Sequence, residues 1–131
     1  MLVGELAIRL YQRLNEAVIL QRGNVETSEL QPNPQECHRN VALWCERDGN
    51  STPVQGWLVA DYSVTGIAIN VQFFAHSVVR TESGDLIDIT PNTLNRSYRF
   101  LIHDAADGDF DEMVNAKKIS SVIYQAEAKA E

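Results

Sequence analysis

Residues 67–90 read IAINVQFFAHSVVRTESGDLIDIT. In the first half of this stretch, Ile69, Val71 and Phe73 alternate with polar or small residues, which is typical of a strand that buries one face. The ESGD run that follows is rich in turn-forming residues, and the chain after it is β-prone again. This stretch therefore predicts an antiparallel hairpin.

The rest of the chain places helices before the strands. Apolar residues at helical spacing predict helices over 3–21 and 34–47, the first burying Leu6, Leu10 and Leu14. Further segments predict strands over 54–62, 86–90, 98–103 and 119–124, and a short helix over 110–117. Helices followed by strands, with no dividing linker, indicate an α+β fold. We expect one domain over residues 1–131, with N-terminal helices packed on a small antiparallel sheet.

Charge and hydropathy exclude several classes of partner. The 131 residues contain 18 Asp and Glu against 11 Lys and Arg, for a net charge of −7. Such a field repels phosphate backbones and anionic lipid, so we expect no nucleic-acid partner and no membrane partner. No stretch approaches the roughly 18 consecutive apolar residues that a membrane-spanning helix needs.

The two cysteines, Cys37 and Cys45, are predicted to lie on one helix. Eight residues of helix separate them by about 12 Å of axial rise. A disulfide requires Cα atoms within about 7 Å, so the two thiols are expected to stay unpaired. Unpaired thiols fit a reducing compartment, and we therefore expect a cytoplasmic protein.

Cys37 is the first candidate for chemistry. It lies three residues after Pro34, a residue type that favours the first turn of a helix. Helix N-termini favour negative charge and lower thiol pKa values, and the thiolate is the reactive form of cysteine. A free cysteine facing Val41 and Trp44 can equally be a small core residue.

His76 and Asp88 are predicted to lie on one face of the hairpin, the face away from the core. Ile87 and Ile89 are the best core candidates of the returning strand, so Asp88 points the other way, like His76. A five-residue turn over 81–85 places the two side chains diagonally, within reach of each other. A thiol, a base and a group that orients the base are what nucleophilic catalysis requires. Asp85, in the turn, is the competing carboxylate.

Three segments carry a family resemblance: ECH at 36–38, AHSVV at 75–79 and GDLIDITP at 84–91. They resemble the Cys, His and Asp boxes of papain-like folds, in particular of the transglutaminase-like and NlpC/P60-like branches. The resemblance implies a papain-like α+β fold with Cys37 as nucleophile, His76 as base and Asp88 as orienting acid. It also implies Gln31 as an oxyanion donor, since papain-like proteases carry a glutamine six residues before the cysteine.

These features predict a cofactor-independent cysteine hydrolase or acyltransferase, that is, a peptidase, amidase, deamidase or transglutaminase-like enzyme. The substrate class is a peptide, another amide or a small molecule. Two alternatives stay open. Zinc could be bound by Cys37, His38, Cys45, His76 and His103, although their spacing matches no common zinc motif. The chain could instead be a non-catalytic interaction module that uses an exposed Trp44 or Trp57. Thiol reactivity separates an enzyme from such a module, with Cys45 as the internal control.

Overall fold

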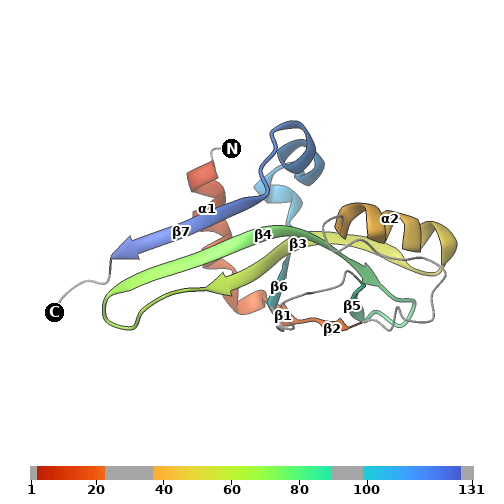
Figure 1. Ribbon diagram of the computed structural model, residues 1–131, viewed down its shortest axis with the longest axis horizontal. Coiled ribbons are helices and arrows are strands. Elements are labelled where there is room, and N and C mark those ends of the chain that lie inside the picture. The colour runs from red at the N-terminus through yellow and green to blue at the C-terminus, as the bar shows by residue number, and fades with distance from the viewer. Residues whose placement is uncertain (1–2, 23–36, 90–98, 128–131) are drawn as a thin grey trace. The chain divides into compact units, whose positions relative to one another are not determined.

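The computed structural model describes residues 3–22, 37–89 and 99–127 (Figure 1). In chain order its elements are α1 (Val3–Gln12), the 3₁₀ helix η1 (Leu14–Glu16), β1 (Val18–Ile19), β2 (Gln21–Arg22), α2 (Cys37–Arg47), β3 (Thr52–Asp61), β4 (Ala68–Arg80), β5 (Leu86–Asp88), β6 (Arg99–Ile102), the 3₁₀ helix η2 (Ala105–Asp107), the π-helix η3 (Glu112–Ala116) and β7 (Ser121–Glu127). The contacts divide the chain into two compact units. The first unit comprises residues 1–18, 56–75 and 98–131, and the second comprises 19–55 and 76–97.

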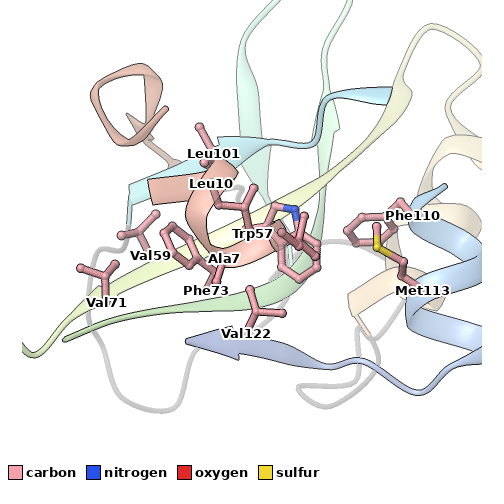
Figure 2. Close-up of a cluster of buried hydrophobic side chains, with 11 residues drawn as sticks. Ala7, Leu10, Trp57, Val59, Val71, Phe73, Leu101, Phe110, Met113 and Val122 are labelled. Carbon is pink, nitrogen blue, oxygen red and sulfur yellow. The ribbon is translucent and has the colours of Figure 1, made fainter. Parts of the chain in front are cut away.

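The first unit contains the larger apolar core. Strand β6 pairs antiparallel with β3, and β7 pairs antiparallel with β4, for example at Phe73 and Val122. Helix α1 packs on β7, where the rings of Tyr11 and Tyr124 stack with centroids 4.0 Å apart. Figure 2 shows the buried cluster: Leu6, Ala7, Leu10, Trp57, Val59, Val71, Phe73, Leu101, Phe110, Met113 and Val122. Alternation along β4 thus buries the face that the sequence predicted.

The second unit places one helix against the end of the hairpin. Strand β5 pairs antiparallel with β4, with Val79 opposite Ile87 and Arg80 opposite Leu86, and β2 pairs parallel with β5. A five-residue turn joins β4 to β5, as predicted, and Gly84 holds the positive φ of 94° that this turn requires. Val41 of α2 packs on the buried side chains of Val79 and Ile89.

The α+β class and the antiparallel pairing are confirmed, but the first predicted helix is wrong beyond its middle. Helix α1 ends at Gln12 rather than at residue 21. Leu14 still packs on the core from the following 3₁₀ turn, whereas the side chain of Ile19 is 75% exposed. The β-branched Val18 and Ile19 favour extended backbone, and continuing the helix through exposed residues would bury nothing. No helix in the described part of the chain is long and apolar enough to span a membrane.

Candidate active site

Cys37 is the first residue of α2 and is half-buried. Burial of the thiol alone would raise its pKa. Hydrogen bonds from His38 and from His76, together with the positive charge of these imidazoles, outweigh burial and lower the pKa of Cys37 from 9.0 to about 6. A sulfur in this position is therefore largely thiolate near neutral pH, which is the form that attacks carbonyl carbon.

His76 and Asp88 are in direct contact, as the hairpin register predicted. The distance from His76 Nε2 to Asp88 Oδ1 is 3.1 Å, and both residues are buried. Burial opposes a charge on His76, but the hydrogen bond to Asp88 and the interaction with Cys37 raise its pKa from 6.5 to about 9. The histidine thus favours the imidazolium form beside a thiol that favours the thiolate form.

A second histidine also reaches the thiol. His38 follows Cys37 in α2, and its Nδ1 is hydrogen-bonded to the hydroxyl of Ser77, the residue that follows His76 in β4. Ser77 is buried, with 2% of its surface exposed. The sequence offers His38 only as a zinc ligand and indicates no role for Ser77. Their signal in the sequence is that they adjoin Cys37 and His76, and this signal is weak because consecutive strand residues point to opposite faces.

Cys45 lies two turns further along the same helix and has the opposite environment. It packs at the apolar cluster around Val41 and Val79 rather than against imidazole. Burial, with a smaller contribution from the charge of Asp48, raises the pKa of the Cys45 thiol above its ordinary value. Helix α2 therefore carries one thiol whose pKa is lowered and one whose pKa is raised.

Two other predicted candidates have different outcomes. Asp85, the competing carboxylate, is exposed in the β4–β5 turn, where it accepts a hydrogen bond from the Ser83 hydroxyl at 3.2 Å. Asp88 is consequently the carboxylate that His76 contacts. Gln31, the predicted oxyanion donor, lies outside the described residues.

The structure also locates residues named by the zinc and interaction-module hypotheses. Among residues 3–22, 37–89 and 99–127, no three His, Cys, Asp or Glu side chains form a group that could hold a metal ion. His103 belongs to the first unit, where Trp57 Nε1 donates to its Nδ1 at 3.1 Å and its Nε2 contacts the Gly108 carbonyl at 2.8 Å. Trp57, one of the two candidate docking residues of the interaction-module alternative, is fully buried and is therefore not an exposed docking residue. Trp44 is half-buried.

Comparisons with known proteins do not assign the chain to a family. No family model matches it, and no curated protein or solved structure matches it. The chemistry of the site is therefore derived from its own groups. These are a thiol, two imidazoles, a hydroxyl and a carboxylate, all within the second unit.

Proposed function

We propose that Cys37, His76 and Asp88 form the catalytic triad of a cofactor-independent cysteine hydrolase or acyltransferase with a papain-like arrangement. The observation that carries this proposal is the buried hydrogen bond between His76 and Asp88 beside a thiol whose pKa is lowered to about 6. A purely structural cysteine has no need of such surroundings, as Cys45 illustrates on the same helix. Perturbed pKa values of this kind concentrate at functional sites.

Acylation follows from the charges of the pair. The Cys37 thiolate attacks the carbonyl carbon of an amide or ester, and the carbonyl oxygen becomes an oxyanion. First-turn backbone N–H groups of α2 lack intrahelical acceptors and are suited to stabilise that negative charge. The His76 imidazolium then gives its proton to the leaving amine or alcohol as the bond to carbon breaks, which leaves a thioester on Cys37. Asp88 holds the imidazole ring in the orientation that this transfer requires.

Deacylation uses the same residues in reverse. Neutral His76 takes a proton from water, the oxygen adds to the thioester carbon, and the thiolate departs with the electron pair of the carbon–sulfur bond. An amine in place of water gives transamidation, and a side-chain amide as substrate gives deamidation. All three outcomes need an acyl donor and no redox partner. We infer that the substrate is an amide or a related acyl compound.

Acyl-enzyme formation tests this proposal directly. The protein is mixed with p-nitrophenyl acetate, and the acetyl group is located by peptide mass spectrometry. We expect acetylation of Cys37, loss of the acetyl-enzyme in Cys37→Ser, and an unchanged acetyl-enzyme in Cys45→Ser. Equal acetylation of the two cysteines in the folded protein would contradict a nucleophilic role for Cys37.

A further inference from the structure

Besides the residues of the proposed triad, the site contains a second interacting pair, His38 and Ser77. Cys37 and His38 are neighbours at the start of α2, and His76 and Ser77 are neighbours in β4. The thiol interacts with His76, and His38 Nδ1 is hydrogen-bonded to the Ser77 hydroxyl. The interaction with His38, the next residue of the helix, also lowers the pKa of the Cys37 thiol. Two imidazoles from two different elements therefore act on the pKa of one thiol.

The two imidazoles have chemically different partners. His76 contacts the carboxylate of Asp88, whose negative charge favours imidazolium. His38 contacts a hydroxyl, which is uncharged and can donate or accept. When the His38 ring accepts the Ser77 O–H at Nδ1, its hydrogen is on Nε2, which is then a donor. Because Ser77 is buried, water cannot easily replace this partner and release the ring.

We propose that His38, held by Ser77, is a second catalytic histidine that donates a hydrogen bond to the Cys37 sulfur whenever that sulfur carries negative charge. This inference rests on the proposed function. His76 is then the group that moves the proton, and His38 is a fixed donor that moves none. Ser77 acts through His38 and is a positioning residue.

The role of His38 is greatest in the step that expels sulfur. In deacylation, water adds to the thioester carbon, its proton passes to His76, and the electron pair of the carbon–sulfur bond returns to sulfur. A donor already at the sulfur stabilises this leaving thiolate in the transition state and again in the resting enzyme. Among the residues that the structure describes, the titratable side chains that act on the sulfur are His38 from α2 and His76 from β4, with Asp88 from β5 acting through His76.

The test is a titration of the Cys37 thiolate by ultraviolet absorbance, with Cys45→Ser in every protein so that Cys37 is the single thiol. His38→Ala is expected to raise the thiol pKa by about one unit or more, because a hydrogen bond to a charged group is worth at least that much. Near the wild-type pKa this change would lower the thiolate fraction about fivefold. His38→Gln keeps an N–H donor near the position of Nε2 and should recover most of the shift. Ser77→Ala should give a smaller rise, because His38 remains but is no longer held.

Two control variants accompany the thiol titration. Ser51→Ala removes another buried serine hydroxyl of the second unit, which donates to Asp48 at 2.7 Å, and should leave the thiol pKa unchanged. His76→Ala is the positive control.

If His76→Ala raises the thiol pKa but His38→Ala and Ser77→Ala do not, the role of His38 is wrong and the triad stands. The donor role is also wrong if His38→Gln behaves like His38→Ala. A pKa of an ordinary cysteine in the otherwise unmodified protein would overturn both proposals. If His38→Ala does not fold, His38→Gln and Ser77→Ala decide, and a wild-type pKa in Ser77→Ala then overturns the role.

Discussion

The two units of this chain use their interiors differently. The first unit buries an extended apolar cluster that includes Trp57 and Phe73, whereas the apolar cluster of the second consists of Val41, Val79 and Ile89 with partly buried neighbours. Buried polar side chains show the reverse distribution. Asp107 is in the first unit, and the second unit holds Asn40, Ser51, His76, Ser77 and Asp88.

The partners of the two buried aspartates explain what this difference means. Asp107 in the first unit accepts hydrogen bonds from Arg9 at 2.6 Å and from Arg13 at 3.0 Å. Arginine stays protonated throughout the physiological range, so this cluster is fixed in charge. Asp88 in the second unit is paired with His76, which can take up and release a proton. The buried aspartate of the first unit therefore has partners of fixed charge, whereas the buried aspartate of the second unit has a partner that can titrate.

The largest expected effect is on stability and comes from the first unit. Phe73→Ala removes a fully buried ring from β4 and should lower the free energy of unfolding by about 3–5 kcal/mol. The pH profile of Cys37 alkylation, measured on the folded protein, should stay at wild type. Urea unfolding followed by circular dichroism measures the first quantity. A shift of the alkylation profile in fully folded Phe73→Ala would contradict the view that Cys37 chemistry depends on the second unit alone.

Ile89→Ala applies the same test inside the second unit. The side chain is 2% exposed and packs on Val41 of α2, so its loss should cost about 2–5 kcal/mol of unfolding free energy. The chemistry of the folded protein should survive, because Ile89 lies in the apolar cluster and not among the side chains that act on the sulfur. Denaturation midpoint and alkylation rate, measured on one preparation, would separate these effects. A loss of Cys37 reactivity without loss of stability would show that this cluster belongs to the site.

Asp88→Asn is expected to change the chemistry more than the fold. Without the carboxylate, the pKa of His76 falls from about 9 and the pKa of Cys37 rises from about 6. The pH range in which thiolate and imidazolium coexist therefore narrows from both ends. The shift of the His76 pKa should be about one to two units, the worth of one hydrogen bond to a charged group. The shift of the Cys37 pKa should be smaller, because Asp88 acts on the thiol through His76. The pH dependence of Cys37 alkylation gives the thiol pKa, and proton NMR gives that of His76. Unchanged pKa values would remove Asp88 from the proposed triad.

Cys45→Ser should have the smallest effect. This side chain is at the margin of the second unit's apolar cluster, and the replacement should change the free energy of unfolding by about 0.5 kcal/mol. Acetylation at Cys37 should proceed at the wild-type rate. A marked loss of acyl-enzyme in this variant would mean that the two thiols act together.

The hairpin could be predicted because its signals are local. Alternation over Ile69, Val71 and Phe73 and the turn around Gly84 set the register, and the register brought Asp88 to His76. The end of α1 could not be predicted, since apolar residues at helical spacing continue past Gln12. Leu14 reaches the core without being α-helical, so its spacing gave no sign of the helix end.

The pairing of His38 with Ser77 could not be predicted either. These residues are 39 positions apart, and their contact depends on how α2 lies against β4. The sequence does not determine how α2 packs against β4. It offered His38 only as one of several dispersed metal-ligating residues.

The difference in reactivity between Cys37 and Cys45 is the most direct test of the account. The wild-type protein is alkylated with iodoacetamide across a pH series, and both cysteines are quantified in each sample by peptide mass spectrometry. We predict that Cys37 reaches half of its maximal rate at a pH of about 6 and that Cys45 reacts only above the ordinary range of a cysteine. Parallel profiles for the two cysteines would contradict the activation of Cys37 and the catalytic role derived from it.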